Sequence, residues 1–237
     1  MGFRKGRQYA ITWCKKAENY SYVKALECYD EAIKRDPTFA KPWFEKGKIF
    51  EDTPELPSNW MWHDVVSPYI TGIKPPPYPE VGSQTANKYR ETLKMFNKAT
   101  ELDPKFVNAW YAKGDFYLGY VNGQGDAVEC FDKVIALDSK YEPAWYGKAE
   151  ALAKLGKHEE VIKCCDKAIT LLPVDAKERN TDDNNYYYSS RWYIKANALS
   201  ELGKHKEAIK CYDEALEMET DQRGIISEGG HIFEMKG

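Results

Sequence analysis

The stretch EPAWYGKAEALAKLGKHEEVIKCCDKAITLLP, residues 142–173, predicts two short helices joined by a turn. Apolar residues recur at intervals of three and four along each half, as on one face of a helix: Trp145, Ala149 and Leu152 in the first half, and Val161, Cys165, Ala168 and Leu172 in the second. Gly156 marks the turn, and Pro173 ends the second helix because proline donates no backbone hydrogen bond. One hairpin of this size cannot bury its own apolar face, so the stretch predicts further copies beside it.

Four segments of the chain share the pattern W-[FY]-x-K-[GA]-x-x-[FYL], and each is followed by a second-helix half. The four segments begin at Trp43, Trp110, Trp145 and Trp192. Their second halves are marked by Thr92, Phe96 and Ala99, by Ala127, Phe131 and Val134, by Val161, Cys165 and Ala168, and by Ala208, Tyr212 and Ala215. Before them, residues 1–19 predict a degenerate first helix and residues 22–35 predict a second helix. The pattern indicates a repeat protein of about five hairpins.

This pattern resembles the tetratricopeptide repeat (TPR), whose signature is W-x2-L-G-x2-Y…A-x3-F…P over about 34 residues. The resemblance covers nearly all of residues 20–220 and rests on four segments in one register. It implies an all-α fold, a right-handed superhelical solenoid of about five helical hairpins. The leucine of the signature is replaced in all four copies, by Lys46, Lys113, Lys148 and Lys195. We expect the stems of these lysines to pack while their ammonium groups reach water.

The repeat register also predicts how the chain is divided. We expect a TPR-like solenoid over residues 1–220, with an insertion at about 51–84 in the second hairpin, a loop at about 174–188, and a C-terminal tail at 221–237. Trp60 and Trp62 lie in the insertion, and two tryptophans need apolar surroundings. The insertion is therefore predicted to be ordered and to pack on the edge of the solenoid.

The charge balance of the chain disfavours nucleic acids and membranes as partners. The 237 residues include 34 basic and 37 acidic side chains, a net charge of −3, whereas a binder of nucleic acid relies on neutralising phosphates. A helical-repeat RNA binder is therefore the weaker alternative. No apolar run approaches 18 residues, and the basic N-terminal stretch lacks the apolar region of a signal peptide. We expect a cytoplasmic protein.

The six cysteines fit small buried hydrophobic residues in a reducing compartment. Four of them occupy the same second-helix position of successive repeats: Cys28, Cys130, Cys164 and Cys211. Equivalent positions on stacked helices are about 8–10 Å apart, which exceeds the reach of a disulfide. No C-x-x-C pair occurs, so we expect neither disulfides nor a bound metal ion.

The sequence offers little support for catalysis. His158 and His205 occupy the same turn position in two repeats, as repeated sequence does, and no nucleophile elbow, metalloprotease or P-loop motif occurs. We therefore expect no catalytic residue and no cofactor. The alternative is an enzyme, or an accessory subunit of one, with a site built under the 51–84 insertion, where His63 and Asp64 form a possible acid–base pair. The PPxY string that begins at Pro75 fits a WW-domain ligand or a rigid tyrosine-anchored loop.

The candidate binding surface comes from the resemblance, because in the TPR family the first helices line a concave groove. It implies a peptide-binding set formed by the residue after each tryptophan and its neighbour four positions on: Phe44 with Lys48, Tyr111 with Asp115, Tyr146 with Glu150, and Tyr193 with Asn197. The alternative is that the rings fill the space between adjacent first helices. The chain is thus expected to be a non-catalytic scaffold that binds a peptide or helix of a partner protein, with self-association left open.

Overall fold

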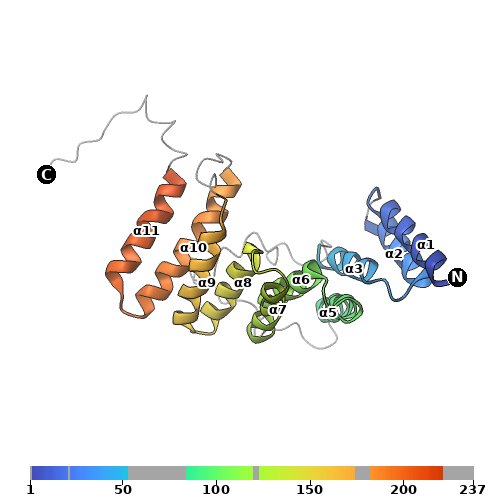
Figure 1. Ribbon diagram of the computed structural model, residues 1–237, viewed down its shortest axis with the longest axis horizontal. Helices are drawn as coiled ribbons and strands as arrows, with labels where there is room; N and C mark the ends of the chain where they lie inside the picture. Colours follow the sequence, from blue (N-terminus) through green and yellow to red (C-terminus); the bar gives the residue numbers. More distant parts are fainter. Residues whose placement is uncertain (1, 21, 53–83, 120–122, 174–181, 221–237) are drawn as a thin grey trace, which may run out of the picture. The chain divides into compact units, whose positions relative to one another are not determined.

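The computed structural model describes residues 2–20, 22–52, 84–119, 123–173 and 182–220 (Figure 1). All regular secondary structure in these ranges is α-helical: α1 (Gly2–Ala17), α2 (Tyr22–Arg35), α3 (Ala40–Asp52), α5 (Gln84–Leu102), α6 (Val107–Leu118), α7 (Gln124–Leu137), α8 (Glu142–Lys154), α9 (His158–Leu171), α10 (Asp182–Glu201) and α11 (His205–Thr220). The predicted all-α fold is confirmed for this part of the chain. None of the helices described is long and apolar enough to cross a membrane.

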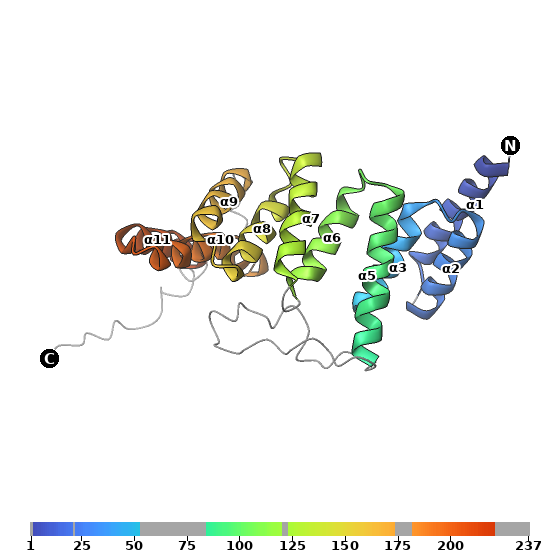
Figure 2. The same cartoon turned by 90° about the horizontal axis from the view of Figure 1, so that it is seen from below.

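The helices pack in five hairpins, as the repeats predict. The chain divides into two compact units, residues 1–138 and residues 139–237. The first unit contains the hairpins α1–α2, α3–α5 and α6–α7, and the second contains α8–α9 and α10–α11. Helices α3 and α5 lie side by side although residues 53–83 separate them (Figure 2).

Two predicted features fall on residues that the structure does not describe. The insertion with Trp60 and Trp62 belongs to residues 53–83, and the tail is residues 221–237. The ordered packing of the insertion and the division of the chain at residue 220 therefore stay predictions.

The first helix of the last hairpin begins earlier than the sequence pattern indicates. Helix α10 starts at Asp182, inside the stretch 174–188 that was expected to be a loop. No proline or glycine interrupts residues 182–201. The predicted loop thus extends seven residues too far.

The turns inside the hairpins of the second unit follow from glycine. Gly156 has a φ of 72° and Gly203 a φ of 73°, in the left-handed region that side chains with a Cβ disfavour. At the first turn the amide of Lys157 donates to the carbonyl of Leu152 over 3.0 Å, and the amide of Gly156 donates to that of Ala153 over 3.0 Å. This pair of bonds is the Schellman motif, which ends α8 where the sequence places the turn.

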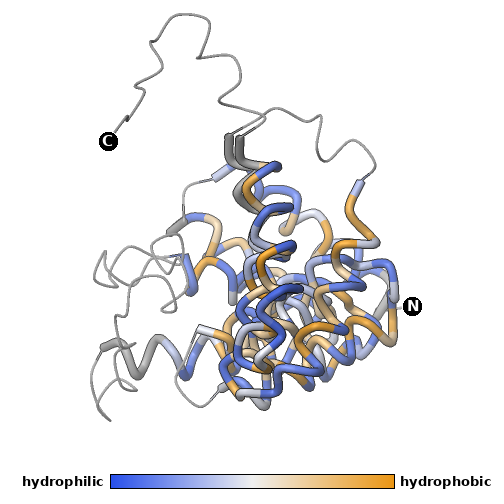
Figure 3. Tube along the Cα trace, turned by 90° about the vertical axis from the view of Figure 1, so that its left-hand side faces the viewer, coloured by the Kyte–Doolittle hydropathy of each residue, from blue (hydrophilic) through white to orange (hydrophobic). Residues whose placement is uncertain are grey.

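Within a hairpin, a small residue of the first helix faces a ring of the second. A Cβ added at Gly47 would lie 2.7 Å from the ring of Phe96, and one added at Gly114 would lie 3.0 Å from the ring of Phe131. Glycine is thus needed here for close approach, and the two helices bury a shared apolar face. Hydrophobic and hydrophilic residues alternate along the helices accordingly (Figure 3).

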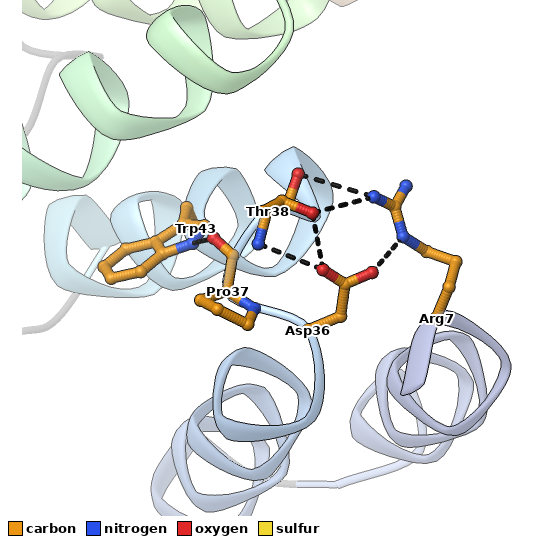
Figure 4. A network of polar contacts seen from close by, with 5 residues as sticks. All are labelled: Arg7, Asp36, Pro37, Thr38 and Trp43. Atoms are coloured by element: carbon orange, nitrogen blue, oxygen red, sulfur yellow. Dashed lines mark hydrogen bonds and ion pairs between the residues drawn. The ribbon is translucent and has the colours of Figure 1, made fainter. Parts of the chain in front are cut away.

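The repeated tryptophan fastens three of the first helices, α3, α6 and α8, to the connection that precedes each of them. Its indole nitrogen donates to a backbone carbonyl six residues earlier, in the pairs Trp43 with Pro37 (3.2 Å, Figure 4), Trp110 with Pro104 (3.0 Å) and Trp145 with Ser139 (3.0 Å). Because the acceptor is a main-chain carbonyl, serine serves in one repeat as well as proline does in the others.

The repeated lysine connects neighbouring hairpins through its charge. The ammonium of Lys46 lies 2.5 Å from a carboxylate oxygen of Asp30 on α2, and that of Lys195 lies 2.6 Å from Asp166 on α9. The stems pack as expected, but these two ammonium groups end on an aspartate of the preceding hairpin.

In the third hairpin the same lysine makes a different contact. The position that corresponds to Asp30 is Asn97, and the ammonium of Lys113 lies 5.1 Å from the ring of Trp110 and 5.9 Å from that of Tyr117. Asn97 carries no charge, and the ammonium of Lys113 lies over aromatic faces instead.

Five of the six cysteines are buried, as expected of small hydrophobic residues, and Cys211 is half-buried. Burial raises the pKa of the Cys14 thiol to about 11 and that of Cys130 to about 12. These thiols are protonated at neutral pH, so they are poor nucleophiles.

Candidate functional site

The structure divides the predicted binding residues between the two units. In the first unit Phe44 is buried, with its ring 5.0 Å from that of Phe106 and 6.3 Å from that of Phe96. It belongs to the apolar core of α3, α5 and α6. Lys48 is exposed one turn later on α3, with its ammonium 5.7 Å from the Phe44 ring. Phe44 thus belongs to the core beneath the exposed face of α3, and Lys48 lies on that face.

Two more of the predicted rings contact the second helix of their own hairpin. The half-buried ring of Tyr111 lies 5.8 Å from that of Phe131, and the half-buried ring of Tyr193 lies 6.2 Å from that of Tyr212. The Tyr212 hydroxyl donates to the side-chain oxygen of the exposed Asn197 over 2.6 Å. These rings partly fill space inside their own hairpin, and each also keeps exposed surface.

Tyr146 has different surroundings from the other three rings. The second-helix position that is Phe96, Phe131 or Tyr212 in the other hairpins is Cys165 in this one. The ring of Tyr146 stacks instead with the guanidinium of Arg191, whose central carbon lies 3.8 Å from the ring centroid. A guanidinium this close to an aromatic face gains a cation–π attraction, which increases as water is excluded.

Arg191 is a fully buried residue of α10. Its guanidinium donates hydrogen bonds to a carboxylate of α8 and to a hydroxyl of α10. Its Nε donates to Glu142 Oε1 over 2.9 Å and its Nη2 donates to Glu142 Oε2 over 3.1 Å. Its Nη1 donates to the Ser190 hydroxyl over 3.1 Å. The fork-shaped pairing with a carboxylate fixes both partners in one geometry, so the network joins the first helices of two successive hairpins.

The network ends on the predicted binding residues of α8. The Tyr146 hydroxyl donates to Glu150 Oε1 over 3.1 Å. Burial, together with the negative charge of Glu150, raises the pKa of Tyr146 well above its usual value. The hydroxyl is therefore protonated throughout the physiological range, and it holds the Glu150 carboxylate in place on α8.

Sequence reasoning missed Arg191. In the other repeats the residue before the tryptophan is Pro42, Ala109 or Ala144, each of which is buried. An arginine at a position reserved for small buried residues was the available signal, because a buried charge requires a partner.

A second polar network lies at the end of α2 in the first unit (Figure 4). The buried Asp36 carboxylate accepts hydrogen bonds from the Thr38 amide over 3.0 Å, from the Thr38 hydroxyl over 2.6 Å, and from Arg7 Nε. Burial alone would raise the pKa of Asp36, but the hydrogen bonds from Thr38 and Arg7 outweigh it and lower the pKa. The network organises the connection between α2 and α3, so we assign it a structural role.

The described residues also contain an open hollow on the α3–α5 hairpin. It has a volume of about 620 Å³ and contains none of the eight predicted binding residues; its lining is Trp43, Arg90, Leu93, Lys94, Asn97, Lys98 and Glu101. Two of its lysines form ion pairs on α5, Lys94 with Glu91 and Lys98 with Glu101, each at 3.5 Å. Its lining combines the apolar side chains of Trp43 and Leu93 with charged side chains of α5, so it is an open surface hollow.

The described residues contain no group of His, Cys, Asp and Glu side chains that indicates a metal site. Within those ranges no three His, Cys, Asp or Glu side chains gather closely enough to hold a metal ion. His63 and Asp64, on which the enzyme alternative depends, lie outside the described residues.

Comparison with known proteins identifies the fold. A family model described as a domain of unknown function, DUF3856, matches residues 129–232, which is less than half of the chain. No curated protein matches the sequence significantly. Solved structures are similar over most of their length. One of MamA has 18% identity, covers 90% of this chain and 96% of its own, and has a TM-score of 0.63.

Two further structures give the same result. MamA from Desulfovibrio magneticus RS-1 has 17% identity, a TM-score of 0.61, and coverage of 94% of this chain and 99% of its own. YrrB, described as a TPR protein with an unusual peptide-binding site, has 14% identity, a TM-score of 0.59, and coverage of 94% and 89%. These likenesses confirm the predicted TPR fold.

Proposed function

We propose that this chain, which has the tetratricopeptide-repeat fold, is a non-catalytic scaffold that binds a peptide or helix of a partner protein on its first-helix faces. The similarity to TPR proteins supports a role in protein interaction. Peptide binding by YrrB, a protein of the same fold, supports the peptide as the kind of ligand.

The observation that carries the proposal is the arrangement of Tyr146 and Glu150. Arg191 is anchored by Glu142 and stacks on the Tyr146 ring, and the Tyr146 hydroxyl bonds to Glu150. A site fixed before the ligand arrives loses little entropy on binding. A scaffold that needed only a stable fold would gain little from this buried charge, because an apolar residue packs as well there.

The chemistry of the surface suggests its ligand. Tyrosine provides a large contact area at low entropic cost, and the carboxylate of Glu150 favours a peptide with lysine or arginine. On α10, Tyr193 and the exposed Asn197 provide a further ring and an amide one turn apart. In the first unit Lys48, Tyr111 and Asp115 provide groups of the same kinds on α3 and α6.

The proposed setting is the cytoplasm, because free cysteines are typical of a reducing compartment. The net charge of −3 makes a protein a better candidate partner than a nucleic acid.

A random-peptide display library, selected on the full-length chain, tests the proposal. We expect enrichment of peptides that contain lysine or arginine. The selected peptides should bind Glu150→Lys at least about tenfold more weakly, since an attraction becomes a repulsion. Glu159→Lys is the matched control, because Glu159 is exposed on the second helix α9. If Glu150→Lys folds and binds the same peptides with unchanged affinity, the first-helix face of the second unit is not the binding surface.

A further inference from the structure

The last described helix, α11, exposes a face that its counterpart α9 covers. Ile209 is 58% exposed and Leu216 is 48% exposed. Their equivalents on α9 are the half-buried Ile162 and Ile169. Helix α9 packs against the first helix of the next hairpin, α10, whereas α11 is the last helix of the described residues. We call the contact between a second helix and the first helix of the next hairpin a junction. The exposed face of α11 has the residues of such a junction, and no described helix packs on it.

The α11 face also carries the aspartate that pairs with a lysine at other junctions. At two junctions an aspartate of the second helix holds the lysine of the next first helix, in the pairs Asp30 with Lys46 and Asp166 with Lys195. Asp213 of α11 occupies the same register position, midway between Ile209 and Leu216, and is exposed. A helix that docks here in the usual way would bring a lysine to Asp213.

The first helix of the chain carries such a lysine. Trp13, Lys16, Ala17 and Tyr20 match the spacing W-x-x-K-[GA]-x-x-[FYL] of the other first helices. The ammonium of Lys16 lies 4.6 Å from the Trp13 ring and 6.0 Å from the Tyr20 ring. Lys113 lies over Trp110 and Tyr117 at similar distances in α6. Helix α1 thus carries the side chains with which the other first helices pack on a second helix.

Helix α1 also exposes the ring that such helices use. In two repeats an aromatic residue lies four positions before the tryptophan and packs on the preceding hairpin. Phe39, before Trp43, packs against the core of α1 and α2. Phe106, before Trp110, lies with its ring 5.0 Å from that of Phe44 on α3. Tyr9 has this position in α1 and is 58% exposed. Four of the six large apolar side chains exposed among the described residues belong to these two ends of the chain: Tyr9, Tyr20, Ile209 and Leu216.

We propose that α11 of one copy of the chain receives α1 of a second copy, so that the repeats continue from one molecule to the next. Lys16 pairs with Asp213, and Tyr9 covers apolar surface around Ile209 and Leu216. The two surfaces differ, so the contact is heterologous and each bound copy keeps one end available. Association therefore grows beyond a dimer as concentration rises. This inference concerns the ends of the chain and is independent of peptide binding on the first-helix faces.

Charge reversal in the full chain tests the proposal by sedimentation velocity over a range of concentrations. Wild type should self-associate, and Lys16→Asp alone and Asp213→Lys alone should each associate at least about tenfold more weakly. An equimolar mixture of the two variants should associate again, because Asp at 16 then meets Lys at 213 and the unchanged ends still match. The double variant should also associate with itself.

Apolar variants provide a second measurement. Ile209→Glu should weaken association by about tenfold or more, because the face of α11 can no longer be buried without desolvating a charge. Leu155→Glu is the control, since Leu155 is exposed at the end of α8 and lies outside the junction. Circular dichroism should show unchanged helicity for both.

Three results overturn the proposal. Wild type that stays monomeric at every concentration excludes the contact. A mixture of the two charge variants that does not associate excludes the pairing of Lys16 with Asp213. A fall in the melting temperature of monomeric Ile209→Glu, without a change in association, indicates that residues 221–237 of the same chain cover α11.

Discussion

The two units each contain an arginine paired with a carboxylate, but the buried partner differs. In the first unit Asp36 is 5% exposed and Arg7 is 44% exposed. In the second unit the side chain of Arg191 is 0% exposed and that of Glu142 is 12% exposed. One pair thus buries its anion and leaves the cation near water, whereas the other buries the cation most deeply.

This difference determines how strongly each network depends on a single partner. Asp36 keeps two hydrogen bonds from Thr38 if Arg7 is removed, so its charge stays partly compensated. The Nε and Nη2 atoms of Arg191 both lose a carboxylate oxygen if Glu142 is removed. A buried charge that loses its counterion costs far more than an exposed one. The second unit should therefore be the more sensitive of the two to loss of one partner.

The largest effect is expected for Glu142→Ala. It removes the carboxylate that pairs with two nitrogens of the fully buried Arg191 side chain, which should lower the free energy of unfolding by about 3–5 kcal/mol. Urea denaturation followed by circular dichroism measures the change. Glu159→Ala, on the exposed surface of α9, is the control and should change little. A loss below about 1 kcal/mol for Glu142→Ala would show that solvent reaches Arg191.

A smaller loss is expected for Arg7→Gln. The Asp36 carboxylate keeps its bonds from Thr38. The change removes the charged hydrogen bond from Arg7 Nε to Asp36 and the two long bonds from Arg7 Nη2 to Thr38, at a cost of about 1.5–3 kcal/mol. The same denaturation experiment applies, with Lys5→Gln on the exposed part of α1 as control. If Arg7→Gln destabilises more than Glu142→Ala does, the contrast between the two networks is reversed.

Acid should weaken the first network through Asp36. Because its pKa is lower folded than unfolded, this carboxylate stabilises the fold fully above its unfolded pKa of about 3.9, and the contribution is lost as pH falls through the folded pKa. The stability difference between wild type and Asp36→Asn should be largest near neutral pH and should shrink below about pH 4. Denaturation midpoints measured across that range provide the test. A difference independent of pH would mean that Asp36 has no shifted pKa.

The smallest effect is expected for the lysine–aspartate pairs between hairpins. Lys46→Met and Lys195→Met keep a long packed stem and lose half-exposed ion pairs, so each should cost under about 1 kcal/mol. Lys163→Met, at an exposed site of α9, is the control. High salt should reduce the difference between wild type and either variant. Losses well above this size would indicate that the pairs are protected from water.

Most of the fold was predictable because each hairpin repeats the same local physics. The interval between Trp145, Ala149 and Leu152 predicts a helical face, and the copies at Trp43 and Trp110 require a stack of such hairpins. Gly156 predicts its turn because only glycine adopts the left-handed backbone at low cost. The start of α10 was missed, because its polar first turn resembles a loop in composition alone.

The candidate site was predictable only in part, because repeat register places residues but does not give their contacts. Register puts Tyr146 and Glu150 on one helix face, and the structure joins them by a hydrogen bond. It does not reveal that Phe44 is core, since that depends on Phe106 and Phe96 of other helices. Whether the eight residues bind a peptide stays a prediction.

The indole-to-carbonyl bonds at the ends of the second helices have a spectroscopic consequence. Indole emission depends on the polarity and hydrogen bonding around the ring, and Trp43, Trp110 and Trp145 each donate to a backbone carbonyl in the connection before their own helix. Each ring is therefore a built-in fluorophore at one link of the repeat array. Variants that keep one of these three tryptophans and carry phenylalanine at the other six tryptophan positions of the chain would report separately on which link opens first as denaturant is added.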